Sequence, residues 1–144
     1  MNYFQTDNYF NDNINKYGCL FFSLMDIAEQ HTGHSFIPKT INQLYQSEID
    51  NGEMLEDCYV LSHEKVLQDA LEVFECHDKV SYVGSWYNDK LMSRKSWGGR
   101  EGQYMILQFR TANGNGHFRR INYDPYKPLI NLTNLMSIRY YNIG

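Results

Sequence analysis

The apolar residues of this chain change their spacing about halfway along it, and that change limits the folds available to it. In the first half they recur every three or four positions, which is the period of α-helices. In the second half they stand in short runs of β-branched and aromatic residues, which are typical of strands. Helices followed by antiparallel strands predict an α+β fold, with an N-terminal helical half packed on a C-terminal antiparallel β-sheet.

Capping and turn residues set the expected bounds of these elements. The first helix is predicted over 19–31 with Gly33 as its stop, the second begins near Pro38, and Ser62 is a good N-cap for the third. The sequence ANGNG at 112–116 predicts a hairpin. Residues 1–17 have no period and are expected to pack across a surface as a leader. The predicted strands are 80–83, 104–111, 118–123 and 136–142.

Composition excludes several classes of protein. Apolar residues make up 42% of the chain and charged residues 21%, a globular balance, and no linker or repeat divides residues 1–144, so a single domain is expected. The net charge of −4 argues against nucleic-acid binding. The N-terminus lacks the features of a signal peptide, and no run reaches membrane-spanning length, so no membrane partner is expected.

The cysteines indicate the compartment. Cys19, Cys58 and Cys76 form no CxxC pair, and three thiols cannot all be paired within one molecule. This pattern favours a reducing compartment and predicts a cytoplasmic protein.

Cys19 is the strongest candidate for a reactive residue. It opens the first predicted helix, where free N–H groups and the helix dipole stabilise a thiolate. Cysteine catalysis also needs a base from a distant part of the sequence, and His117 follows a glycine-rich turn and opens a strand. Asp124 is the first acidic residue after His117 and could orient its imidazole.

These motifs together resemble the papain-like cysteine peptidase superfamily, and in particular its compact bacterial branch, which includes the bacteriocin-leader (double-glycine) peptidases. The matching elements are Gly18–Cys19, Gly116–His117–Phe118 and Asp124–Pro125, and the resemblance covers roughly residues 10–144. It implies a papain-like domain with the cysteine on the first central helix and the histidine and aspartate on the sheet. It also implies that Cys19, His117 and Asp124 are the catalytic residues.

The sequence departs from that family in two places. Family members carry a glutamine six residues before the cysteine to help form the oxyanion hole, and here that position is Asn13. Asn13 is shorter but can donate the same N–H. Seven steps separate His117 from Asp124, and along a straight strand they would place the two side chains about 23 Å apart. The triad therefore requires the chain to reverse after His117.

Each of these residues also has an ordinary structural explanation. A cysteine in an apolar run is usually a packing residue, which fits Cys58 as well as Cys19. His117 could be a hairpin residue, and Asp124–Pro125 is a common turn sequence.

No metal site or cofactor is expected. Cys76 and His77 are adjacent, but the sequence contains no second ligand pair with zinc spacing. His31 and His34 lie near the end of the first predicted helix, where they suit its dipole and need no further role.

Residues 84–102 are predicted to form a long loop that binds a substrate or a partner. The segment contains Trp86 and Trp97 together with several basic residues, and aromatic and arginine residues are enriched at binding hot spots. The alternative is a surface hairpin whose tryptophans cap the core. Arg119 and Arg120 form a local positive patch that favours an acidic peptide or a negatively charged partner.

Two functions from different classes follow. The first is a small cysteine peptidase or amidase-like protein, in which Cys19 attacks a carbonyl, His117 transfers the proton, and Asn13 stabilises the oxyanion. The second is a catalytically degenerate papain-like scaffold that binds a protein, for example an inhibitor encoded by a phage or mobile element. A papain-like transferase or deconjugating enzyme would need the same thiolate. Substrate identity and oligomeric state are left open.

Overall fold

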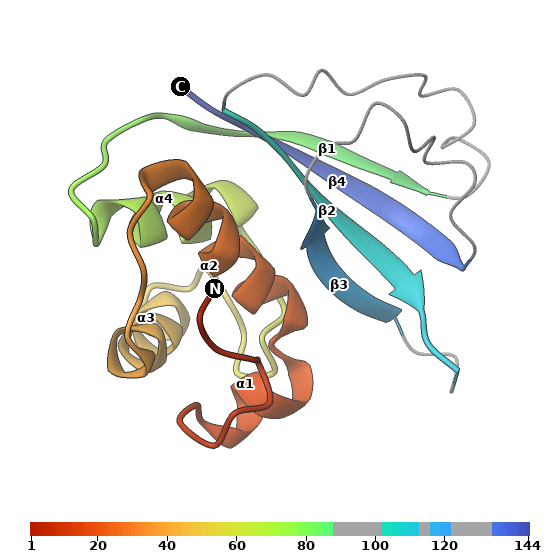
Figure 1. Ribbon diagram of the computed structural model, residues 1–144, viewed down its shortest axis with the longest axis horizontal. Helices are drawn as coiled ribbons and strands as arrows, with labels where there is room; N and C mark the ends of the chain where they lie inside the picture. The colour runs from red at the N-terminus through yellow and green to blue at the C-terminus, as the bar shows by residue number, and fades with distance from the viewer. Residues whose placement is uncertain (88–101, 113–115, 122–133) are drawn as a thin grey trace.

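The computed structural model describes residues 1–87, 102–112, 116–121 and 134–144. Within these residues the chain is an α+β protein, as predicted, with helices on one side of a four-stranded antiparallel sheet (Figure 1). None of the described helices combines the length and apolar character needed to cross a membrane.

The three long helices have the bounds that their capping residues predict. They are α2 (Cys19–Thr32), α3 (Pro38–Asp50) and α4 (His63–Glu72). Helix α2 ends at Gly33, whose φ of 74° is the left-handed conformation that glycine adopts without strain. The Ser62 side chain caps α4 by accepting a hydrogen bond from the Lys65 N–H at 3.2 Å.

A short helix within the predicted leader is a correction. Helix α1 (Asp12–Tyr17) is capped by Asn11, whose side chain accepts a hydrogen bond from the Ile14 N–H at 2.9 Å. Its one fully buried side chain, Ile14, leaves no apolar period to recognise, because six residues make fewer than two turns.

The strands are β1 (Val80–Tyr87), β2 (Gln103–Arg110), β3 (Gly116–Ile121) and β4 (Leu135–Ile143). Their order in the sheet is β1-β4-β2-β3, so β3 lies at an edge of the described sheet. The predicted hairpin is present as the antiparallel pair of β2 and β3, although residues 113–115 lie outside the described residues. Strand β1 runs four residues further than predicted, so residues 84–87 belong to the sheet and not to a loop.

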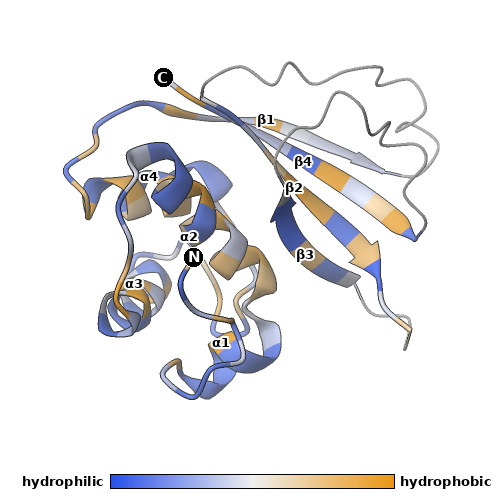
Figure 2. Ribbon diagram, viewed as in Figure 1, coloured by the Kyte–Doolittle hydropathy of each residue, from blue (hydrophilic) through white to orange (hydrophobic). Residues whose placement is uncertain are grey.

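The two faces of the sheet carry different clusters of buried side chains, and apolar stretches of β4 are interrupted by polar residues (Figure 2). Ile106, Tyr141 and Ile143 face the helices and join their core. A second cluster lies on the opposite face and contains Met105, Leu107, Ile138 and Tyr140. Helix α2 packs on β3, β2 and α4, which places its first turn beside the edge strand.

Candidate functional site

A pocket of about 320 Å³ lies where the start of α2 meets β3 and the first residues of the chain. Two of the predicted catalytic residues, Cys19 and His117, both line it, although they are far apart in the sequence. The predicted binding residues Arg119 and Arg120 line it as well. Its full lining is Met1, Tyr3, Phe4, Gln5, Thr6, Cys19, Phe22, Ser23, Asp26, His117, Phe118, Arg119 and Arg120.

Cys19 is the first residue of α2, and its free thiol is half-buried. Its backbone carbonyl accepts a hydrogen bond from the Ser23 hydroxyl at 2.7 Å, one turn further along the helix. Gly18 precedes it at the junction with α1 and makes no side-chain cap. The thiol therefore stands at a helix N-terminus and borders an open pocket.

Gly18 is required by close packing and not by its backbone angles. Its φ of −84° suits any residue, but a Cβ added there would lie 2.6 Å from the carbonyl oxygen of Ile14 and 2.9 Å from its Cα. Both atoms belong to the backbone of α1 and cannot rotate away. The glycine thus lets α1 and α2 meet immediately before Cys19.

Replacing Gly18 with alanine is expected to lower the free energy of unfolding by about 1 to 3 kcal/mol, because the added methyl group forces α1 and α2 apart. Urea unfolding measures the change. Gly144→Ala is the matched control, since a Cβ there meets nothing within 4 Å. Equal stabilities of the two variants would contradict the packing role of Gly18.

His117 borders the pocket from the edge strand, but the pleat directs it away from α2. It is opposite Phe109 in the β2–β3 register, and Phe109 packs on the sheet face that the helices do not cover. By alternation, Phe118 and Arg120 face α2, whereas His117 and Arg119 project from the other face and are exposed. Among the described residues no hydrogen bond joins Cys19 to His117.

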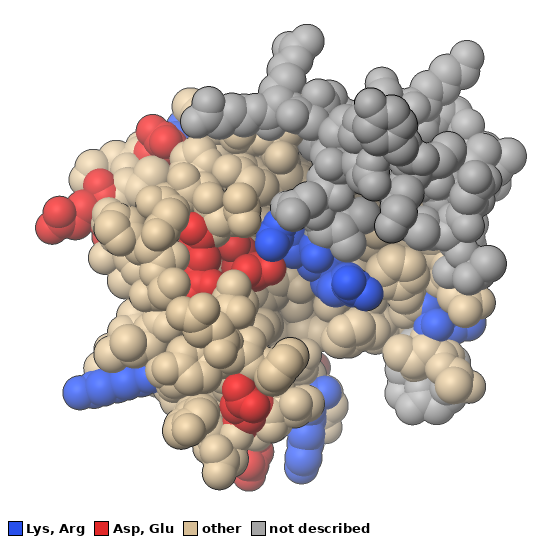
Figure 3. Space-filling view, in the orientation of Figure 1, with Lys and Arg blue, Asp and Glu red and all other residues tan. Residues whose placement is uncertain are grey.

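An ion-pair network forms one wall of the pocket. The Arg120 Nε lies 2.7 Å from Asp26 Oδ2, and the Met1 ammonium group lies 3.1 Å from Asp26 Oδ1 and 3.2 Å from Glu29 Oε1. Burial lowers the pKa of the Met1 amine, but hydrogen bonds to Asp26 and Glu29 outweigh it and raise that pKa overall. Figure 3 shows basic side chains lying directly beside acidic ones where the helices meet the sheet.

The two predicted arginines consequently have different environments. Arg120 is paired with Asp26 and stabilises the contact between β3 and α2. Arg119 is exposed and forms no ion pair with any other residue that the structure describes. Arg119 is therefore an exposed cation at the rim of this pocket, on the side of β3 that is turned away from α2.

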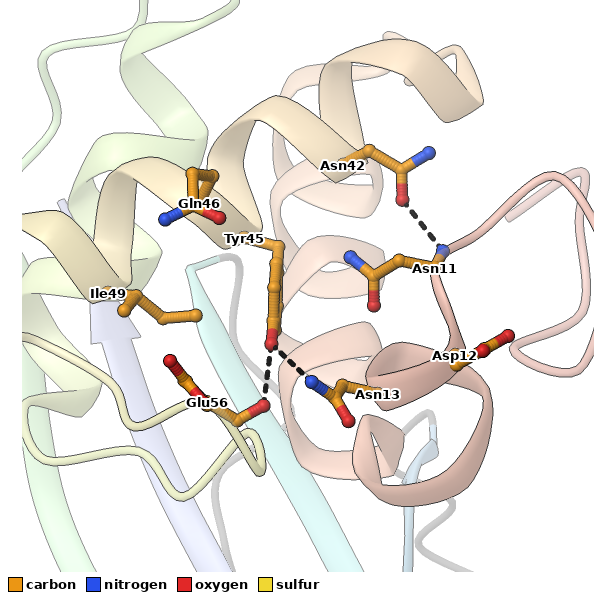
Figure 4. Close-up of a pocket in the computed structure, with 8 residues that line it drawn as sticks. All are labelled: Asn11, Asp12, Asn13, Asn42, Tyr45, Gln46, Ile49 and Glu56. Atoms are coloured by element: carbon orange, nitrogen blue, oxygen red, sulfur yellow. Dashed lines mark hydrogen bonds between the residues drawn. The ribbon is translucent and has the colours of Figure 1, made fainter.

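Asn13 does not fit the predicted oxyanion role, and this is a correction. Its side-chain amide donates a hydrogen bond to the Tyr45 hydroxyl at 3.0 Å, and that hydroxyl donates to the Glu56 carbonyl at 2.6 Å (Figure 4). These residues line a different pocket, of about 380 Å³, between α1 and α3. Burial raises the pKa of Tyr45, which keeps its hydroxyl a donor. Asn13 therefore joins two helices instead of facing Cys19.

Trp86 is also corrected by the structure. It lies on β1 and packs edge-on against Tyr140, with ring centroids 5.0 Å apart, as part of the second apolar cluster. It is a packing residue of the sheet and not part of a binding loop. Trp97 and Asp124 lie outside the described residues.

The N-terminal segment supplies pocket residues that the sequence did not indicate. Tyr3, Phe4 and Gln5 line the pocket, and the Gln5 amide donates to the carbonyls of Ile14 and Asn15 at 3.0 and 3.2 Å. These bonds hold the segment against the end of α1. In the sequence, residues 1–17 are polar and aromatic with no regular spacing of apolar residues. This pattern predicts that the segment packs on a surface but not where it packs.

Cys58 provides a contrast to Cys19 within the same molecule. It is 3% exposed, packs in the helical core as predicted, and its thiol lies 3.7 Å from the Asn13 carbonyl oxygen. Burial, followed by the negative charge of Asp57, raises the pKa of the Cys58 thiol to about 12. This thiol is therefore protonated at neutral pH, and solvent cannot reach it.

A four-stranded antiparallel sheet, with a thiol-bearing helix packed beside its edge strand, defines an α+β protein with a cysteine-lined pocket. Residues 1–118 match the sequence profile of a family described as "Protein of unknown function, DUF261", and the chain belongs to this family. The matched residues include Cys19 and His117. Comparison with curated proteins gave no match. Comparison with solved structures gave none either.

Proposed function

We propose that this protein is a papain-like, cysteine-dependent hydrolase that cleaves an amide bond in a peptide or protein. The observation that carries the proposal is the shared pocket: Cys19, at the first position of α2, and His117, at the start of β3, both line it. A helix N-terminus favours a thiolate, and a histidine at the same pocket can serve as its base once its ring turns toward the sulfur. The three cysteines are free, which supports a reducing compartment such as the cytoplasm.

The proposed reaction has two steps. In the first, the Cys19 thiol gives its proton to His117, the sulfur bonds to the substrate carbonyl carbon, and the amine leaves with that proton. In the second, water attacks the thioester, His117 takes a proton from the water, and that proton returns to the thiol as the acid departs. Asp124 remains the predicted orienting residue for His117.

This chemistry requires the His117 imidazole to turn toward the Cys19 sulfur. To reach Cys19, the His117 ring must move around the outer edge of β3. Because β3 is the edge strand of the described sheet, no other described strand blocks this movement. Apo enzymes often hold their catalytic groups apart until a substrate binds. Closure around a substrate is therefore part of the proposal.

The walls of the pocket favour a particular kind of substrate. Phe22 and Phe118 provide apolar surface, and Arg119 provides an exposed cation that forms no ion pair with another described residue. A peptide with an acidic side chain beside an apolar one would contact both the apolar walls and the Arg119 cation. This would be the preferred substrate of the hydrolase.

A second candidate, a catalytically inactive papain-like module that binds a protein, is favoured by two observations. The pleat of β3 projects His117 from the face opposite α2, and the Asn13 amide is bonded to Tyr45 instead of facing the pocket. In this alternative the same pocket would bind an acidic peptide without cleaving it.

Thiol labelling distinguishes the two functions. With iodoacetamide near neutral pH, Cys19 is expected to react at least about 10-fold faster than Cys76 and much faster than Cys58, because thiolate content and access set the rate. His117→Ala should slow the labelling of Cys19 and leave that of Cys76 unchanged. Mass spectrometry of the digested protein assigns each rate to its cysteine.

His34→Ala is a matched control, since His34 is exposed on the helical half and does not line the pocket. If Cys19 and Cys76 react alike, and His117→Ala changes neither rate, the hydrolase proposal is wrong and the binding module is favoured.

A further inference from the structure

Three ligating side chains, one from α2 and two from the connection between α4 and β1, meet on the side of the sheet where α2 ends. His31, Cys76 and Asp78 each present one ligand atom, and these atoms all lie within 4.8 Å of one another. His31 Nε2 lies 2.8 Å from Asp78 Oδ2. This cluster does not belong to the pocket that Cys19 lines.

The backbone that carries two of these residues is held in place before any ligand arrives. The Cys76 N–H donates to the Leu71 carbonyl at 3.2 Å, at the end of α4. The Gln68 side chain donates to the Asp78 carbonyl at 2.9 Å and accepts from the Val80 N–H at 3.1 Å. A fixed backbone lowers the entropic cost of assembling a site, so the backbone positions of two of the three ligands are preorganised.

His31 is oriented as metal-binding histidines are. Its Nδ1 lies 2.8 Å from the Tyr104 hydroxyl on β2, and its Nε2 donates a hydrogen bond to Asp78 Oδ2 at 2.8 Å; a metal ion would replace that proton on Nε2, with Nδ1–H donating to the Tyr104 oxygen. The residue also lies in the last turn of α2, where the helix dipole favours a cation. Since oxygen atoms contact both ring nitrogens, neither is free to act as a base for Cys76.

We propose that His31, Cys76 and Asp78 bind Zn²⁺. One nitrogen, one sulfur and one oxygen ligand suit this borderline-soft ion, which accepts all three types. The Asp78 side chain is 54% exposed, so the ion can enter and a water can occupy the fourth position.

Binding requires only local movement. Zinc lies about 2.0–2.3 Å from such ligands, which places the ligand atoms about 3.5 Å from one another. The ion inserts between His31 Nε2 and Asp78 Oδ2, the Cys76 thiol loses its proton to solvent, and a zinc–sulfur bond forms. The site would then join the end of α2 to the connection between α4 and β1.

The sequence predicted no metal site here, because Cys76 and His77 have no second ligand pair with zinc spacing. The completing residue, His31, lies on another helix and reaches the site only after α2 has packed on α4.

Cobalt titration of the reduced protein tests the proposal, because a cobalt–thiolate bond gives a charge-transfer absorption band. Wild type is expected to bind one Co²⁺ with this band, and zinc should displace it. Cys76→Ser should abolish the band and weaken Zn²⁺ binding, measured by calorimetry, by at least about 100-fold. Asp78→Asn should also weaken Zn²⁺ binding. Both Cys76 and Asp78 are at least partly exposed, so we expect the two variants to keep the fold.

Two matched controls accompany these variants. Cys19→Ser removes the other half-buried thiol, and His77→Ala removes the exposed histidine next to Cys76; both are expected to keep the band and the affinity. Saturating Zn²⁺ should raise the melting temperature of wild type but not of Cys76→Ser. The proposal is overturned if wild type gives no thiolate band, or if Cys76→Ser binds zinc as wild type does.

Discussion

Replacing Glu48 with glutamine is expected to raise the free energy of unfolding at pH 7 by about 2 to 3 kcal/mol. Glu48 lies on α3, is 1% exposed, and faces Asp69 of α4. Burial raises the pKa of Glu48 well above its ordinary value of 4.5, and the negative charges of Asp69 and Glu53 raise it further. At neutral pH the folded protein therefore holds a proton that the unfolded chain releases.

The sign follows from that proton. Below pH 4.5 Glu48 is protonated in both the folded and the unfolded state, so its raised pKa does not change folding stability there. Above 4.5 the unfolded state ionises while the folded state does not, so folding stability falls by about 1.36 kcal/mol per pH unit until Glu48 itself ionises. Glutamine has nearly the same size as the protonated carboxyl group and does not titrate, so it removes this loss.

Urea unfolding at pH 5, 7 and 9 measures the effect, which should grow with pH. Glu72→Gln is the control, because Glu72 is exposed on α4 and its replacement should change stability little. A Glu48→Gln variant that is less stable than wild type at pH 9 would mean that the native protein contains an ionised Glu48.

Acidification from pH 6.5 to pH 4 is expected to lower the free energy of unfolding by about 2 to 3 kcal/mol because of a single histidine, His63. His63 opens α4, packs against the tilted ring of Tyr82 with ring centroids 4.3 Å apart, and has Nδ1 2.8 Å from the Tyr141 hydroxyl. Burial, followed by the positive charge of Arg139, lowers the pKa of His63 to about 4. The folded protein therefore contains a neutral imidazole that accepts the Tyr141 hydrogen bond.

Here the sign is reversed. Above pH 6.5 both states are neutral and the full stability is present, whereas between 6.5 and 4 the unfolded chain gains a proton that the folded protein does not. His63→Asn should remove this dependence, because its side-chain oxygen can accept the same hydrogen bond without titrating.

The measurement is urea unfolding between pH 4 and pH 8, with His34→Asn as the control at an exposed position. Between pH 4.5 and 6.5 the effects of His63 and Glu48 oppose each other, so wild type should show a plateau there. In Glu48→Gln the free energy of unfolding should rise as the pH increases through this range. In His63→Asn it should fall as the pH increases. A plateau that survives both replacements would contradict the two assignments.

The sequence predicted those elements whose signals are local. Ser62 at the N-cap of α4 and Pro38 in α3 gave correct helix starts, and Gly33 gave the correct end of α2, because capping depends on a few neighbouring residues. Helix α1 and the extension of β1 through Trp86 were missed. Neither has a periodic apolar pattern of its own, and each is stabilised by contacts with distant elements.

The candidate site was predicted in part. Pairing Cys19 with His117 correctly anticipated that the start of α2 and the start of β3 border one pocket. The oxyanion assignment of Asn13 was wrong, because spacing along the chain does not tell on which side of α1 a side chain emerges. The N-terminal wall of the pocket was missed because the apolar residues of the first segment have no regular spacing, so its path across the surface cannot be predicted.

By itself, the sequence determined the α+β class, the starts of the long helices, and the position of one thiol at a helix N-terminus, since all of these depend on residues a few positions apart. The tertiary structure alone decided which side chains meet. It directed His117 and Arg120 to opposite faces of β3, paired Arg120 with Asp26, and brought His31 to Cys76. The physical reason is that strand register and helix packing are set by the burial of the whole core, and a shift of one residue reverses the face on which every side chain lies.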